Sequence, residues 1–175
     1  MATEDREKQP AKGVDDLKFY QLALKLLQAA YKMAAELPDC EKYNLSAQVR
    51  RAALSAVLNM AEGYGRYHYL DKLRFFYIAR GSLSEVRSAF TSAQLVGYIN
   101  SDQLQWAYDT EAEAQKSLNG YIGYLRRKQQ GREEFGDKLI CEDVVVYEDQ
   151  GIGELGNQEV VRWLRRTGRS SRPRG

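Results

Sequence analysis

Residues 45–85 read LSAQVRRAALSAVLNMAEGYGRYHYLDKLRFFYIARGSLSE, and this stretch decides the fold. Apolar and small residues recur in it at spacings of three and four, which predicts two amphipathic helices. The first starts near Ser46 as its N-cap, and Gly63 and Gly65 are expected to supply the left-handed conformation that ends it. The second, over about 70–96, presents large apolar side chains. Because the first helix presents mostly small ones, the two are expected to pack closely.

Two further helices are expected on either side of this pair. Residues 17–37 form a wide apolar stripe, and Pro38 ends it. Residues 102–128 form another stripe, in which Glu111 and Gln115 interrupt an otherwise apolar face. Four long helices joined by short loops predict an all-α protein. The expected architecture is an antiparallel up-down-up-down four-helix bundle with an irregular C-terminal extension.

The two ends of the chain differ from the bundle in composition. Residues 1–14 are polar and predict a disordered N-terminus, residues 15–130 the bundle, and residues 131–175 a C-terminal extension. Within the extension, residues 140–159 contain six acidic residues and no Lys or Arg, whereas residues 160–175 contain six arginines and no acid. Such a pattern indicates a tail that contacts itself, a neighbouring subunit or nucleic acid.

Two shorter patterns lie inside this extension. Residues 139–147 are rich in β-branched side chains and resemble a strand, and residues 159–166 could form a short basic helix. A single strand has no partner in a helical bundle. It therefore needs an edge from another subunit or a binding partner, or it belongs to a disordered tail.

The sequence also bears on location. No apolar run approaches the roughly 20 residues that span a bilayer, and the N-terminus lacks the apolar core of a secretory signal. The two cysteines, Cys40 and Cys141, are far apart and match no disulfide or zinc motif. We therefore expect a cytoplasmic protein with no membrane partner.

Four polar residues fall in or beside the packing faces of the central helices: Asn59, Glu62, Arg80 and Glu85. One interpretation is a structural polar cluster that sets helix register and oligomer geometry. The other is a ligand pocket. A di-metal site in a bundle usually uses Glu-x-x-His motifs, and His68 has no such partner, so neither a metal nor another cofactor is expected.

A basic and aromatic surface is the strongest candidate for binding. Cations neutralise phosphates, and flat rings stack on unpaired bases, so this surface could bind nucleic acid. Tyrosine and arginine are also enriched at subunit interfaces. The sequence therefore favours a subunit interface as strongly as a nucleic-acid site. The residues are Arg50, Arg51, Arg66, Tyr67, His68, Lys72 and Arg74.

Basic residues elsewhere extend this hypothesis. Arg126 and Arg127 lie at the end of the fourth helix, where they could contact phosphates or only complement the helix dipole. Arg162, Arg165 and Arg166 lie in the arginine-rich tail, which could bind RNA, DNA or an acidic protein, or fold back on the acidic stretch before it.

Two motifs carry a resemblance to a known family: LSAQVRRAALSAVLNMAEGYGR at 45–66 and FFYIARGSLSEV at 75–86. The chain resembles, over about residues 15–128, the four-helix-bundle proteins called 23S rRNA-intervening sequence or S23-like proteins. The resemblance implies a ring, expected to be a homopentamer, without established biochemical activity. A more distant relative is the accessory variability protein of diversity-generating retroelements, which binds a reverse transcriptase and nucleic acid.

Three hypotheses about function follow. The first is a non-enzymatic oligomeric accessory or scaffold protein that binds RNA or DNA, with a reverse transcriptase as a candidate partner. The second is a purely structural oligomer that binds a protein or small molecule without affinity for nucleic acid. The third, an enzyme using Glu62, Glu85 and Glu111, requires a bound metal.

Overall fold

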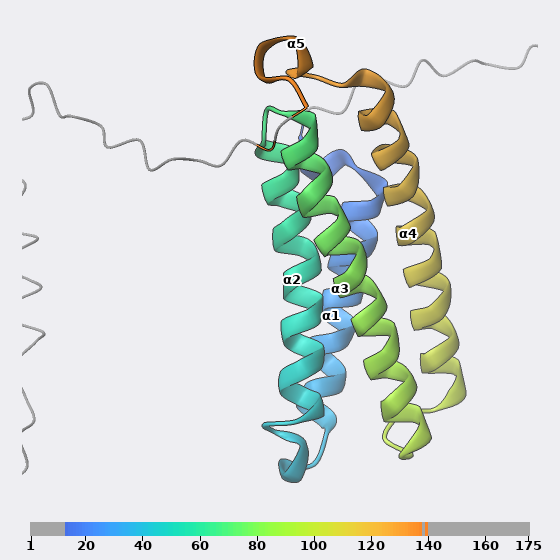
Figure 1. Cartoon of the computed structure of the whole chain (residues 1–175). Helices are drawn as coiled ribbons and strands as arrows, with labels where there is room; N and C mark the ends of the chain where they lie inside the picture. Colours follow the sequence, from blue (N-terminus) through green and yellow to red (C-terminus); the bar gives the residue numbers. More distant parts are fainter. Residues whose placement is uncertain (1–12, 138, 140–175) are drawn as a thin grey trace, which may run out of the picture. The chain divides into compact units, whose positions relative to one another are not determined.

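The computed structural model describes residues 13–137 and residue 139, and within them it is an all-α four-helix bundle. The long helices are α1 (Lys18–Glu36), α2 (Leu45–Gly65), α3 (Tyr69–Leu95) and α4 (Ser101–Lys128). They run alternately down and up, as expected from the sequence (Figure 1). Each packs on two neighbours, α1 and α3 both lying against α2 and α4.

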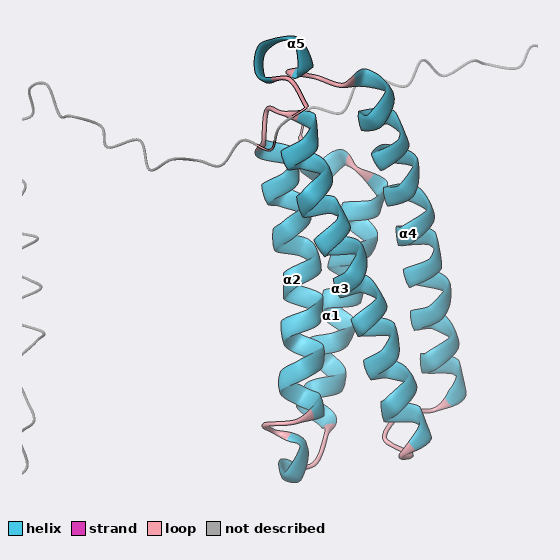
Figure 2. Cartoon of the chain, viewed as in Figure 1, coloured by secondary structure: helices cyan, strands magenta, loops and turns pink. Residues whose placement is uncertain are grey.

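Short elements complete the described part of the chain. Two 3₁₀ helices, η1 (Val14–Asp16) and η2 (Asp39–Glu41), flank α1, and one further turn of helix, α5 (Arg132–Phe135), follows α4. Residues 13–137 contain no strand (Figure 2). No helix in the same residues is both long and apolar enough to cross a membrane.

The core confirms the expected division between small and large side chains. On α2 the small residues Ala52, Ala53 and Ala56 are buried. On α3 the large residues Phe76 and Leu83 are buried. The Phe76 ring meets the rings of Phe19 and Tyr121 edge-on, with centroids 5.8 Å and 5.2 Å away. Rings from three helices therefore pack together in the core beside the first turn of α1, where edge-to-face contacts add to the gain from burial.

The two glycines of α2 have other roles than the sequence predicted. Positive φ angles occur among the described residues only at Gln129 and three other glycines, so neither Gly63 nor Gly65 is left-handed. A Cβ added to Gly63 would lie 3.0 Å from the Phe75 Cβ and 3.2 Å from the Lys72 carbonyl oxygen. Gly63 is therefore needed for the close approach of α3.

The expected N-cap at Ser46 is also wrong. The helix begins at Leu45, with Asn44 in the cap position and no side-chain hydrogen bond there. The Ser46 hydroxyl instead donates to the carbonyl oxygen of Ala34, 3.3 Å away, near the end of α1. An unpaired carbonyl at a helix end is satisfied in this way by the neighbouring helix.

The start of the C-terminal extension is part of the folded body. Residues 131–137 do not leave the bundle after α4 but turn back over the link between α2 and α3, with Gly131 at a φ of 82°. The other predictions for the ends lie outside the described residues. These are residues 1–12 of the expected disordered N-terminus, residues 140–147 of the strand pattern at 139–147, the basic helix at 159–166, and Arg162, Arg165 and Arg166. At the described end of the N-terminal segment, Val14 begins η1.

Candidate functional site

The predicted basic and aromatic surface divides into buried and exposed parts. His68 is 1% exposed and Lys72 is 8% exposed. Contrary to the prediction, neither side chain lies on an outer binding surface. The Lys72 ammonium donates to the carbonyl oxygen of Tyr64, 2.9 Å away, at the end of α2. Burial lowers the pKa of Lys72, because an apolar environment disfavours its charged form. Its role is to satisfy the end of a helix.

Two arginines of the same prediction also make contacts within the chain. Arg50 donates to the Ala34 carbonyl oxygen at 3.1 Å, which joins α2 to α1. Arg66 forms an ion pair with Glu62 one turn earlier, and its guanidinium lies 5.0 Å from the centre of the Phe75 ring. Arg51 is exposed on the second turn of α2, and Arg74 is exposed on α3.

A clasp formed by residues 130–137, here called the α5 clasp, covers the link between α2 and α3. The Tyr69 amide donates to the Gln130 carbonyl oxygen at 3.0 Å, and the Tyr69 hydroxyl donates to the Asp137 carboxylate at 2.8 Å. His68 Nε2 lies 3.1 Å from the Gly136 carbonyl oxygen. Because a carbonyl oxygen only accepts, Nε2 carries the proton of this hydrogen bond.

Aromatic contacts and charge complete the α5 clasp. The Phe135 ring packs edge-on against Tyr67 and His68, with centroids 6.4 Å and 5.9 Å away. The Tyr67 hydroxyl donates to Glu134 at 3.1 Å, and this hydrogen bond raises the pKa of Tyr67. The clasp was not among the predicted elements; its only signal in the sequence is the pair Gly131 and Gly136, which bracket one turn of helix that ends in Phe135.

The expected polar cluster does not form, since its four residues have separate surroundings among the described residues. Asn59 donates to the Ser55 carbonyl oxygen at 2.8 Å within α2. Glu62 pairs with Arg66, as described above, and Arg80 donates to Asn119 of α4 at 3.2 Å. Glu85 is exposed on α3. They do not bond to one another, because Asn59 bonds within α2, Glu62 bonds to Arg66, Arg80 bonds to α4, and Glu85 faces solvent.

A different polar network lies between α3 and α4. Glu111 is 1% exposed, and its carboxylate accepts hydrogen bonds from Arg87, 3.4 Å away, and from Gln115. Gln115 also donates to Ser84 at 3.0 Å. The Arg87 guanidinium lies 4.1 Å from the centre of the Tyr108 ring. The break in the apolar stripe at Glu111 and Gln115 was the sequence signal for this network, whose partners come from α3.

The three glutamates of the enzyme hypothesis lie in different environments. Glu62 is on the surface of α2, Glu85 is exposed on α3, and Glu111 is buried against Arg87. The described residues contain no group of three or more His, Cys, Asp or Glu side chains placed to hold a metal ion.

One hollow of the described surface is a groove between α3 and α4, here called the α3–α4 groove. Its volume is about 770 Å³. Its walls combine apolar and aromatic side chains with two arginines, and none of its lining residues is acidic. The lining consists of Tyr69, Leu70, Leu73, Arg74, Tyr77, Ile78, Arg126 and Gln129.

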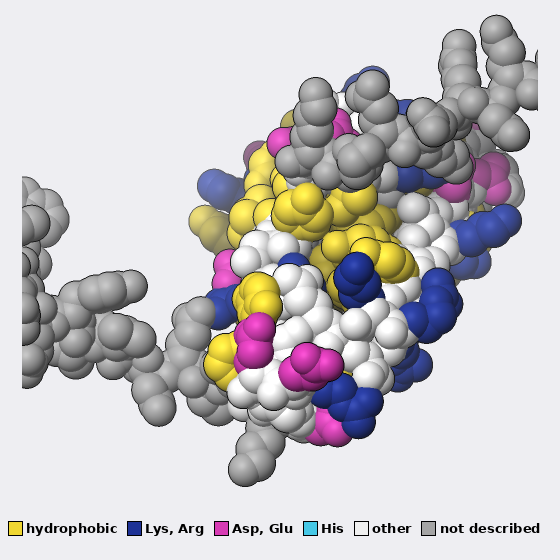
Figure 3. Space-filling model, turned by 90° about the horizontal axis from the view of Figure 1, so that it is seen from above, with side chains coloured by type: hydrophobic (Ala, Val, Ile, Leu, Met, Phe, Trp, Pro, Cys, Tyr) yellow, Lys and Arg dark blue, Asp and Glu magenta, His cyan; other side chains and the backbone are white. Residues whose placement is uncertain are grey.

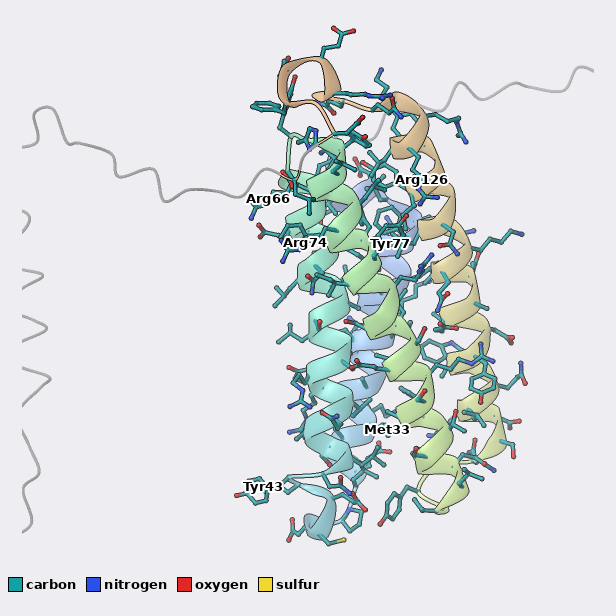
Figure 4. All side chains as sticks on the ribbon, viewed as in Figure 1. Met33, Tyr43, Arg66, Arg74, Tyr77 and Arg126 are labelled. Carbon is teal, nitrogen blue, oxygen red and sulfur yellow. The ribbon has the colours of Figure 1, made fainter. Side chains whose placement is uncertain are left out.

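The groove brings together two arginines that the sequence placed in separate patches. Arg74 lies on α3 and Arg126 on α4, at the same end of the bundle as Tyr77 (Figure 4). Arg126 and Arg80 lie 5.8 Å and 5.0 Å from the centre of the Tyr77 ring. Arg127 is exposed next to Arg126. Seen from this end, hydrophobic side chains gather beside Lys and Arg (Figure 3).

A second hollow lies at the opposite end of the bundle, between α1 and α4. Its volume is about 310 Å³. Met33, Phe90, Ile99 and Trp106 provide apolar walls, and Lys32 is among the charged residues of its lining. This hollow is smaller than the α3–α4 groove and mixes both signs of charge.

Comparisons with known proteins agree with the fold. A family model described as 23S rRNA-intervening sequence protein matches residues 15–120. No curated protein matches the chain. A crystal structure of a protein with unknown function from the S23 ribosomal protein family of Bacteroides thetaiotaomicron is similar, with a TM-score of 0.52 and 21% identity. The similarity covers 62% of this chain and 97% of that one, and at this identity it supports the fold alone.

Proposed function

The chain belongs to the 23S rRNA-intervening sequence protein family, and from this premise we propose that it is a non-enzymatic, oligomeric accessory protein that binds RNA or DNA. The observation that carries the proposal is the α3–α4 groove, where Arg74 and Arg126 face a surface without acidic lining. Arg127 adds a third exposed cation beside them. Arginine is suited to phosphate because its planar guanidinium donates several hydrogen bonds at once.

The contacts of these arginines support this use. Arg74 is exposed, and Arg126 lies against the Tyr77 ring, so its guanidinium is held near the groove by an aromatic face. By contrast, Arg50, Arg66 and Lys72 bond to groups of the bundle itself. The binding surface we propose is therefore smaller than the sequence predicted and lies mainly on α3 and α4.

Assembly is the second part of the proposal. Leu54 and Leu58 of α2 are 39% and 57% exposed, which leaves apolar area that a second copy could cover. The family resemblance implies a ring of five. A ring would repeat the weak charged groove several times and so raise the overall affinity for a long nucleic acid. We also propose a cytoplasmic location and a reverse transcriptase as one candidate partner, the latter on the resemblance alone.

A purely structural oligomer with a protein or small-molecule partner is the second candidate. The hollow near Met33 and Trp106 favours it, because an apolar floor with an exposed tryptophan can receive an apolar side chain or ligand. This candidate predicts no affinity for nucleic acid even at low salt.

A binding titration decides between the two. The full-length protein is titrated with labelled RNA and DNA at two salt concentrations, and the double variant Arg74→Gln/Arg126→Gln is compared with Lys25→Gln, an exposed cation on α1. We expect the wild-type affinity to fall steeply with salt, because phosphate contacts release counterions. The double variant should bind at least about tenfold more weakly, with a shallower salt slope, whereas Lys25→Gln should match the wild type.

Two results would count against the proposal. Absence of binding at low salt would favour the structural oligomer. Binding that the double variant retains in full would show that the α3–α4 groove is not the binding surface.

A further inference from the structure

We propose that the α3–α4 groove receives an unpaired base, so that the nucleic acid bound there is single-stranded. This inference rests on the proposed function and names the class of nucleic acid that fits the site. It follows from three properties of the groove: its apolar floor, the arginines that α3 and α4 each contribute, and aromatic rings that other residues of the protein hold in place.

The floor of the groove is apolar. Leu70, Leu73 and Ile78 line it, and Ile78 is 43% exposed, although isoleucine is a residue that usually avoids water. A charged phosphate group would not be stabilised by contact with such an apolar surface. The face of a base would be stabilised there, since it is flat and weakly hydrated. In a duplex the faces are covered by neighbouring bases, and only the edges and the backbone are accessible.

Arginines on opposite helices flank this floor. Arg74 belongs to α3 and Arg126 to α4, so each of the two helices contributes a cation to the groove, and no acid is in its lining. A guanidinium can pair with phosphate through its edge and stack on a base through its face. A nucleotide bound in the groove would therefore pack its base on the apolar floor, while Arg74 and Arg126 contact the adjoining phosphates.

The aromatic walls are held in place by the protein itself. The centre of the Tyr77 ring lies 5.0 Å from the guanidinium carbon of Arg80 and 5.8 Å from that of Arg126. The Tyr69 hydroxyl is bonded to Asp137 of the α5 clasp, which fixes the direction of its ring. Walls that are ordered before binding lose little conformational freedom when a ligand arrives. The volume of about 770 Å³ is also in the range of small-ligand sites, which suits one nucleotide.

The test compares three probes of equal length on the full-length protein. They are a labelled single strand, the same strand with abasic sites in place of its bases, and the strand annealed to its complement. The abasic strand keeps every phosphate, so it reports charge alone. We expect the intact single strand to bind about tenfold or more tightly than the abasic strand, because base stacking supplies the difference. We expect it also to bind more tightly than the duplex.

A pair of variants locates the base. Ile78→Ser should bring the affinity ratio of intact to abasic strand toward one, without changing the affinity for the abasic strand. Leu95→Ser is the matched control, since Leu95 is an exposed apolar residue at the far end of α3 and does not line the groove. It should leave the ratio unchanged. Circular dichroism checks that both variants keep the helical content.

The outcomes separate this inference from the proposed function. Equal binding of the intact strand, the abasic strand and the duplex would overturn the inference and leave nucleic-acid binding in place. Preference for the intact strand that Ile78→Ser does not alter would overturn the location of the base. If none of the three probes binds at low salt, the inference and the proposed function both fail.

Discussion

Three polar side chains buried in the bundle, His68, Lys72 and Glu111, each bond to a partner from another element of the fold. His68 and Lys72 look like members of a basic surface in the sequence, yet both are buried and bond to backbone carbonyls. Glu111 looks like a break in an apolar face, and it is the buried acceptor of Arg87. A buried charge is tolerated only with a partner, and sequence spacing does not show the partner when it comes from another helix.

The titration of Tyr67 gives a test at this scale. Its pKa is raised, first because its hydroxyl donates to Glu134 and then because the carboxylate charge opposes formation of the phenolate. A raised pKa in the folded state means that the stabilising contact is fully present below the usual tyrosine pKa of about 10 and is lost as the pH rises through the higher value. The contact between Tyr67 and Glu134 should therefore weaken at alkaline pH, as the Tyr67 hydroxyl ionises.

The measurement is a carbon NMR titration of the Tyr67 ring. We expect Glu134→Gln to move the titration midpoint of Tyr67 to lower pH, because the amide carries no charge and accepts a weaker hydrogen bond. Glu133→Gln is the matched control, since Glu133 is exposed one residue earlier in α5. Equal midpoints in both variants would show that Glu134 does not hold Tyr67.

At the scale of elements, the α2–α3 pair depends on one close approach. The small residues of α2 allow α3 to lie close, and a Cβ added at Gly63 would come within 3.0 Å of a side-chain atom of α3. Both helices and their mutual packing follow from the 3-4 spacing of their residues, which is why the sequence predicted them. The α5 clasp escaped prediction because one turn of helix has too few residues to show any period.

The two glycines of α2 make a matched pair of variants. Gly63→Ala should lower the free energy of unfolding by about 1–3 kcal/mol, because the new methyl group meets Phe75 and the backbone of Lys72. Gly65→Ala has no atom within 4 Å of the new Cβ and no positive φ. It should raise the free energy of unfolding by about 0.4–1 kcal/mol, by restricting the unfolded chain.

Urea unfolding at one fixed protein concentration measures both changes, since stability depends on concentration in an oligomer. A stabilising Gly63→Ala would mean that α3 moves away at little cost. The close approach of the two helices would then not require glycine.

At the scale of the whole molecule, the question is which surfaces of the bundle meet other molecules. Leu54 and Leu58 leave apolar area on α2, while the α3–α4 groove carries the arginines. If copies assemble through α2, the groove stays free on each of them. The two proposals are then compatible, since one surface serves assembly and the other binding.

Replacement of Leu58 tests the assembly. We expect the wild-type mass by light scattering to be about five times the 20.0 kDa of one chain, as the family resemblance implies. Leu58→Glu should reduce this mass, because a charge in an apolar contact is costly to bury. Leu95→Glu is the control, since Leu95 is also exposed but lies at the end of α3. A wild-type monomer, or an unchanged mass in Leu58→Glu, would contradict assembly through this face.

Three features of the fold could be predicted from the sequence: the four helices, their antiparallel order, and the packing of small residues of α2 against large residues of α3. These depend on local periodicity and on loops too short for any other path, and both can be read along the chain. Only the packed structure shows which polar residues are buried and which arginines line the same groove. Arg74 and Arg126 belong to different helices, and their convergence depends on the rotation of each helix about its axis. That rotation is set by the packing of the whole core, so no local stretch of sequence contains it.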